Sequence, residues 1–176
     1  FYLAVMLVLF GLIVRAVSLE FRAHDPQWAR AWDICFTVGS LLPALLLGVA
    51  LGNVIAGIPM AANGDYAGVP LLGLLSPFTL VAGLLGLAMC LSAGAAWVAL
   101  KAPAGSAVHK RAAKLRVPCQ VAALVLFAVA TVLAFAVVKP VFAPGMLAAG
   151  VIIALVFLAC VVASIVLGRK GNDLVA

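Results

Sequence analysis

Charged residues are scarce in this sequence. Asp, Glu, Lys and Arg together make up 9% of its 176 residues, whereas 68% of the residues are hydrophobic. A soluble domain is roughly half apolar and about one-quarter charged. This composition excludes an ordinary soluble domain and predicts a chain that is solvated by the lipid bilayer.

Residues that bind metals or haem, or that perform catalysis, are also scarce. The two histidines, His24 and His109, lie outside the apolar runs, and Met89 is the methionine well inside one. A lone methionine is more often a packing residue than an axial ligand. The sequence has no Ser/His/Asp set, no paired carboxylates within a run and no phosphate-binding glycine loop. We therefore expect no catalytic, cofactor-binding or metal-binding residue in this chain. Four cysteines without CxxC spacing are interpreted as small hydrophobic residues: Cys35, Cys90, Cys119 and Cys160.

Long apolar runs fill most of the chain. A membrane-spanning helix needs about 20 mainly apolar residues, and Gly, Pro and charged residues divide the sequence into five such runs. Backbone groups in lipid must be paired within the protein, and the runs lack the alternation of barrel strands. We predict an all-α fold, a polytopic transmembrane helix bundle that forms a single domain. The expected spans cover residues 1–19, 32–55, 71–100, 117–138 and 146–167.

Basic residues predict the orientation in the membrane. Nine of the eleven lie at connections or tails that alternate onto one face, and the opposite connections contain Lys139. The positive-inside rule places residues 101–116 and Ala176 in the cytoplasm, and Phe1 and residues 57–70 at the periplasmic face. Because the net charge of +6 is gathered in this way, a nucleic-acid partner is not expected. The nine are Arg22, Arg30, Lys101, Lys110, Arg111, Lys114, Arg116, Arg169 and Lys170.

The first run carries polar residues near its cytoplasmic end. Arg15, Ser18 and Arg22 share one face of a helix, whereas Glu20 lies about 140° from Arg15 at roughly 100° per residue. Charge in a membrane helix is costly and often functional. The alternative interpretation is that Arg15 extends to the lipid headgroups and Glu20 marks the helix end.

The second run begins with Trp32 and Asp33, an interfacial aromatic residue beside an acid that we expect in the first helical turn. Gly48 and Gly52 have the spacing that lets a neighbouring helix approach closely. Asn53 either caps the outer end of this helix or contacts a neighbouring subunit. The last two runs are interpreted as plain apolar helices without chemistry of their own.

The ends of the sequence predict an internal fragment. The chain has no initiator Met, opens within an apolar run, and stops where apolar residues return after Arg169 and Lys170. We interpret it as part of a larger protein.

Short motifs follow one another in order along residues 1–100. They are Arg15-Ala-Val-Ser-Leu-Glu20-Phe-Arg22, Trp28, Trp32-Asp33, Gly39-Ser40, Pro43, Gly48-Val-Ala-Leu-Gly52-Asn53, Gly57-Ile-Pro59, Ser76-Pro77-Phe78 and Gly83-Leu84. In this order and spacing they resemble subunit II of the cytochrome bd quinol oxidases, a subunit type that the cyanide-insensitive quinol oxidases share. From residue 117 onward the resemblance rests on hydropathy and topology.

The resemblance implies a two-subunit terminal oxidase of the bacterial inner membrane, which oxidises quinol and reduces dioxygen to water. It implies that haems b and d are bound by the partner, subunit I, and that this chain binds none of them. Subunit II would stabilise subunit I and contribute to paths for protons or oxygen. Membrane lipid and quinone are the further partners that the resemblance implies.

Individual roles follow from the same resemblance. Glu20 matches an acidic position on a proposed cytoplasmic proton route, and Arg15 matches an arginine near the subunit interface. The remaining matched residues are expected at the interface or in a structural role: Arg22, Trp32, Asp33, Gly48, Gly52 and Asn53.

Two other interpretations stay open. A secondary transporter or permease would use helices broken by Gly and Pro to line a site at the middle of the membrane, although no charged residue lies near the middle of any run. A purely structural membrane scaffold would tolerate replacement of both Arg15 and Glu20.

Overall fold

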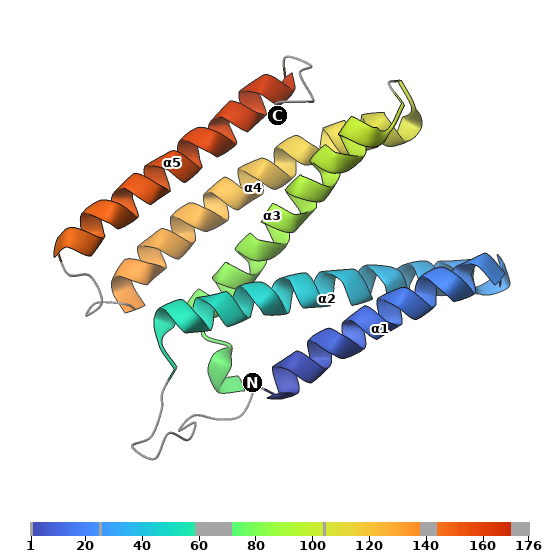
Figure 1. Cartoon of the computed structure of the whole chain (residues 1–176), viewed down its shortest axis with the longest axis horizontal. Coiled ribbons are helices and arrows are strands. Elements are labelled where there is room, and N and C mark those ends of the chain that lie inside the picture. The colour runs from blue at the N-terminus through green and yellow to red at the C-terminus, as the bar shows by residue number, and fades with distance from the viewer. Residues whose placement is uncertain (1, 25, 59–71, 104, 138–143, 170–176) are drawn as a thin grey trace. The chain divides into compact units, whose positions relative to one another are not determined.

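The structure is a computed structural model that describes residues 2–24, 26–58, 72–103, 105–137 and 144–169. The described residues form helices and contain no strand, so the all-α prediction is confirmed for them (Figure 1). The predicted outer connection after residue 58, together with Lys139, Lys170 and both chain ends, lies outside the described residues. The helices are α1 (Tyr2–His24), α2 (Ala29–Ala56), α3 (Pro77–Lys101), α4 (Ala107–Val137) and α5 (Pro144–Arg169), with the short 3-10 turns η1 (Pro26–Trp28) and η2 (Leu72–Leu74).

Four helices are long and apolar enough to cross a membrane, judged by length and composition over the described residues. They are Tyr2–His24, Ala29–Ala56, Pro77–Lys101 and Ala107–Phe135. In α5 the apolar stretch with described side chains is shorter, Gly150–Val166, although the whole helix has 26 residues. These helices correspond in order to the five predicted runs.

Contacts divide the chain into two compact units, Phe1–Leu87 and Ala88–Ala176. In the first unit α1 and α2 lie side by side as an antiparallel hairpin closed by η1, and the start of α3 also belongs to this unit (Figure 1). In the second unit α4 and α5 lie side by side, and the end of α3 belongs with them.

Small residues are prominent among the buried positions of each unit. They include Gly11, Gly39 and Gly48 in the first unit and Ala88, Ala99, Ala112 and Ala123 in the second, whereas most Leu, Ile and Val side chains are exposed. Without water to drive association, membrane helices pack through small residues that let their backbones approach. The large apolar side chains on the outside are suited to lipid or to an apolar partner.

The structure corrects the predicted start of the fourth helix. The segment 101–116 was expected as a polar connection, but α4 begins at Ala107. Ser106 caps it, because its Oγ accepts a hydrogen bond from His109 N at 3.1 Å and its carbonyl accepts one from Lys110 N. The following Ala, Lys, Leu and Arg residues favour helix, so the helix continues outward from the apolar run as a basic extension.

The start of α3 is set in the same way. Ser76 Oγ accepts a hydrogen bond from Thr79 N at 3.2 Å, and Leu80 N donates to the Ser76 carbonyl at 3.0 Å. Pro77 occupies the first helical position, where its missing N–H costs nothing. The predicted span from residue 71 therefore begins later, after the turn η2.

The ends of the first hairpin also differ from expectation. Because α2 begins at Ala29, Asp33 lies beyond the first helical turn, and the prediction that placed it in that turn is wrong. The alanines at 29 and 31 and Arg30 favour helix and extend it ahead of Trp32. α1 continues to His24, so Glu20 lies one turn inside the helix rather than at its end.

Candidate functional site

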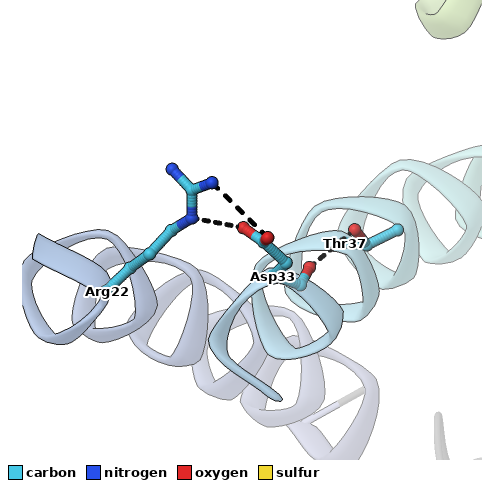
Figure 2. Close-up of polar contacts among 3 residues, drawn as sticks. All are labelled: Arg22, Asp33 and Thr37. Atoms are coloured by element: carbon cyan, nitrogen blue, oxygen red, sulfur yellow. Dashed lines mark hydrogen bonds and ion pairs between the residues drawn. The ribbon is translucent and has the colours of Figure 1, made fainter. Parts of the chain in front are cut away.

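A charged pair joins the two helices of the α1–α2 hairpin near its η1 end. Arg22 Nε lies 2.5 Å from Asp33 Oδ1, and Arg22 Nη2 donates a longer hydrogen bond, 3.4 Å, to Asp33 Oδ2 (Figure 2). Thr37 Oγ1 donates to the main-chain carbonyl of Asp33 at 2.8 Å. The two charged side chains are 55% and 53% exposed. Screening limits such a pair to about 0–1 kcal/mol, so it orients the hairpin more than it stabilises it.

Aromatic rings pack beside this ion pair. The rings of Phe21 and Trp32 stack with their centroids 5.2 Å apart, and the Arg15 guanidinium lies 5.6 Å from the centroid of Phe36. A cation over an aromatic face is attracted by the ring quadrupole, so Arg15 is held against α2. The indole Nε1 of Trp32 is buried and has no hydrogen-bond partner within the described part of the chain.

Glu20 lies on the same end of α1 but outside this cluster. Its side chain is exposed, and the neighbouring Arg22 pairs with Asp33. The main-chain carbonyl of Glu20 lies 3.0 Å from the ring Nδ1 of His24. The carboxylate is thus accessible to water or to another protein at the basic end of the hairpin.

Small residues hold α1 and α2 together further along the hairpin. A Cβ added at Gly39 would lie 2.7 Å from the Gly11 carbonyl oxygen and 3.0 Å from Arg15 N. Ser18 is fully buried, and its hydroxyl donates to the Val14 carbonyl at 2.5 Å. The sequence reading did not identify Gly11 and Gly39 as contact residues. Aligning the two runs as an antiparallel hairpin places these small residues opposite each other, and this would have predicted the contact.

Gly48 and Gly52 lie against the start of α3. A Cβ added at Gly48 would lie 2.8 Å from both the Ala82 carbonyl oxygen and Gly83 Cα. One added at Gly52 would lie 2.8 Å from Ala82 Cβ and 3.1 Å from Thr79 Cα. Both glycines therefore occupy a close contact between α2 and α3, of the kind that their four-residue spacing favours.

Asn53 ties α2 to the segment that precedes α3. Its Nδ2 donates to the Val49 carbonyl and to the Leu74 carbonyl, each at 2.9 Å, and Thr79 Oγ1 donates to the same Leu74 carbonyl at 2.8 Å. The helix continues to Ala56, so Asn53 does not cap its end. The buried amide instead satisfies backbone groups where two segments meet.

An apolar cavity of about 290 Å³ lies beside Asn53 in the first unit. Its walls come from α1, α2 and the segment around η2, and nearly all of the lining atoms are apolar. Such a lining favours an apolar occupant. The lining residues are Ala4, Val5, Leu7, Val8, Leu46, Leu47, Val49, Ala50, Asn53, Leu74 and Leu75.

The histidine rings contact backbone carbonyls. His24 lies at the end of α1, and the Nδ1 of His109, in the first turn of α4, is 2.9 Å from the Ala99 carbonyl. Within the described ranges no three residues among His, Cys, Asp and Glu are grouped as a metal site would require, and the four cysteines are free thiols.

The last two spans are apolar helices, as predicted, but a polar contact that the sequence did not predict joins them. Gln120 of α4 is buried, and its Nε2 donates a hydrogen bond of 2.8 Å to Ser164 Oγ of α5. Buried polar groups in membrane helices tend to pair across helices. Gln120 and Ser164 lie 44 positions apart on separate runs, so no pattern within one run predicts that they pair.

The fold and this hairpin define an integral membrane protein of several α-helical spans. The family model described as cytochrome bd terminal oxidase subunit II matches residues 1–176, and the chain belongs to this family.

Curated relatives agree with the family. The chain is 38% identical over 107 residues to the probable cytochrome oxidase subunit 2 of Haemophilus influenzae. The aligned region covers 57% of this chain and 28% of the relative. It is 34% identical over 131 residues to the cytochrome bd-I ubiquinol oxidase subunit 2 of Escherichia coli K12, and the alignment covers 71% of this chain and 33% of the relative. A further match, 34% identical over 65 residues, is the cytochrome bd ubiquinol oxidase subunit 2 of Bacillus subtilis, covering 36% and 19%. The chain thus spans a third or less of the length of these relatives.

Proposed function

We propose that this chain is part of the second subunit of a bd-type quinol oxidase in the bacterial inner membrane. It stabilises the haem-bearing subunit I and contributes to the access of protons or dioxygen while the complex oxidises quinol and reduces dioxygen to water. The family match over the whole chain carries this proposal. The names of the Escherichia coli and Bacillus subtilis relatives, which are ubiquinol oxidase subunits, support quinol as the electron donor. Family membership also favours this function over the secondary transporter.

The two histidines lie away from the apolar lengths of the helices in the described part of the chain. His24 is the last residue of α1, and His109 lies in the first turn of α4. This arrangement supports the assignment of haems b and d to subunit I. The contribution of the present chain is then packing and access.

The exposed apolar surface supports a role in holding a partner within the membrane. Along α1 the side chains of Leu3, Met6, Phe10 and Ile13 recur every three or four residues and are 55–65% exposed. A stripe of this width suits contact with an apolar helix as well as with lipid. We assign Arg15 and the two-helix contact around Gly11 and Gly39 to the support of this surface.

Glu20 is the residue that we assign to proton access. Reduction of dioxygen to water consumes protons, and hydrocarbon conducts none, so titratable groups and water must lead them into the membrane. Glu20 is an exposed carboxylate at the basic end of α1, whereas Asp33 on the facing helix is paired with Arg22. The positive-inside rule supports a cytoplasmic position for this end.

Substitution of Glu20 tests this assignment in the complete complex. Glu20→Gln keeps the size and hydrogen-bonding capacity but removes the exchangeable proton, so we expect several-fold slower quinol-dependent oxygen consumption with haem content intact. Glu20→Asp should retain more activity. Asp33→Asn is the matched control, because it removes a paired carboxylate from the same end and should leave turnover close to wild type. Wild-type oxygen consumption by a fully haem-loaded Glu20→Gln complex would show that the proton route lies elsewhere.

A further inference from the structure

A buried amide in the second unit has an unsatisfied acceptor. Gln120 is 7% exposed, and while its Nε2 donates to Ser164 Oγ, its Oε1 is buried without a hydrogen-bond partner in the described part of the chain. If the amide were flipped, the Ser164 hydroxyl would donate to the oxygen and the NH2 group would face the same space. In either orientation one polar group of the amide needs a partner from outside the side chains described here, because buried polar groups are satisfied in nearly all native structures.

Gln120 lines a pocket that could hold that partner. The pocket has a volume of about 340 Å³ and lies between the end of α3, α4 and α5, entirely within the second unit. Small side chains such as Ala93 leave the space open, and the hydroxyl-bearing residues Ser92 and Ser164 also line it. A water molecule has a share of about 30 Å³ in the liquid, so the volume admits several of them.

The lining selects the kind of occupant. It contains an amide and two hydroxyl groups but no carboxylate, Lys or Arg, so an ion would find no charge to balance it. A lipid chain or dioxygen could not hydrogen-bond to the buried oxygen of Gln120. Water supplies a donor and an acceptor at once and typically makes about three hydrogen bonds in such sites.

The pocket lies near the basic end of α4. Gln120 follows Arg116 by four residues on α4, which is one helical turn and roughly 6 Å along the axis. Arg116 is itself 2% exposed and belongs to the basic end of the helix, and Ser164 lies five residues before the end of α5 at Arg169. The pocket therefore begins about one turn below the boundary that the basic residues mark.

We propose that the pocket between α3, α4 and α5 is a water-binding site, in which the Gln120 amide and the Ser164 hydroxyl hold water inside the membrane-spanning part of the chain. All residues that line this site belong to the second unit, so the site does not depend on the role proposed for Glu20. It gives the otherwise apolar helices α4 and α5 a shared polar position.

Hydroxyl-radical footprinting of the complete complex in lipid nanodiscs tests the proposal, because radicals formed by X-rays from bound water oxidise the nearest sulfur atoms. Cys160 and Met89 line the pocket, whereas Cys90 lies on α3 outside it. The radical abstracts the thiol hydrogen and dissolved O2 completes the oxidation, so we expect Cys160 to be oxidised several-fold faster than Cys90. Equal rates at the two thiols in the wild-type complex would overturn the proposal, and this comparison needs no variant.

A substitution then assigns the water to Gln120. Gln120→Leu keeps the volume but removes the polar group, so labelling of Cys160 and Met89 should fall several-fold toward the rate of Cys90. Thr131→Val is the matched control on the same helix, because Thr131 Oγ1 bonds to the Phe127 carbonyl within α4 and does not line the pocket. Unchanged labelling in an assembled Gln120→Leu complex would contradict the proposed role of the amide.

Discussion

Replacing Gly48 by alanine should separate α2 from α3. The added Cβ would lie 2.8 Å from the Ala82 carbonyl oxygen and from Gly83 Cα, and both are backbone atoms that no side-chain rotation can move. Carbon atoms in contact prefer about 3.5–4.0 Å, so the helices must move apart by roughly 1 Å. Gly94→Ala is the matched control, because a Cβ at Gly94 of α3 meets nothing within 4 Å in this chain.

The two substitutions should affect stability differently. Overpacking typically costs about 1–3 kcal/mol, and the upper end applies to Gly48 because both clashes involve backbone. Alanine gains about 1 kcal/mol over glycine in a helix, so the net loss at Gly48 is about 2 kcal/mol. The unfolding midpoint of the Gly48→Ala complex should therefore fall. Gly94→Ala keeps the gain in helix propensity, about 1 kcal/mol, and should leave the midpoint unchanged or slightly raised.

The assay is thermal unfolding of the purified complex, followed as the loss of the monodisperse size-exclusion peak after heating. Gly52→Leu places a larger side chain at the next position of the same contact, against Ala82 and Thr79, and should reduce the yield of assembled complex further. A Gly48→Ala midpoint equal to or above that of Gly94→Ala would refute the close contact, and a normal yield of haem-loaded Gly52→Leu complex would show that these glycines are incidental.

Three further predictions concern the hairpin and the topology. Asn53→Leu removes the hydrogen bonds to the Val49 and Leu74 carbonyls and should cost about 1–3 kcal/mol, measured as a lower unfolding midpoint. Ser40→Ala is the milder control, because it loses only the bond to the Phe36 carbonyl within α2. Equal losses in the two variants would count against the proposed link between α2 and the segment before α3. A double-mutant cycle with Arg22→Ala and Asp33→Ala should give a coupling below about 1 kcal/mol, because the pair is half exposed, and a coupling several times larger would mean that a partner buries it. Impermeant thiol labelling of intact cells should modify Asn63→Cys, which lies outside the described residues, and spare Lys110→Cys on α4; the opposite result would reverse the orientation.

The spans could be predicted because the bilayer imposes a length. Each apolar run has to be helical over about 20 residues, and Gly, Pro and charge divide the runs clearly in this sequence. The helix ends could not be predicted in the same way. Ser106 starts α4 ahead of its apolar part, and the residues that follow are polar helix formers that a hydropathy pattern assigns to a connection.

Pairs between helices could not be predicted from the pattern within one run. Arg15 and Glu20 lie on one helix, where they cannot meet, whereas Arg22 pairs across the hairpin with Asp33. Arg22 and Asp33 lie at similar distances along the chain from η1, so a short antiparallel connection between the helices would have predicted that they meet. The pair formed by Gln120 and Ser164 offered no such signal, because the two residues lie on separate runs and the packing of α4 against α5 decides which side chains meet.

Purification of the full-length protein through a tag on this subunit tests the central claim most directly. The account predicts that it co-purifies with a second membrane subunit, that the complex shows the visible absorption bands of haems b and d, and that it consumes oxygen when supplied with quinol. The isolated second subunit should be colourless. A colourless full-length preparation without a haem-bearing partner and without quinol-dependent oxygen consumption would contradict the account.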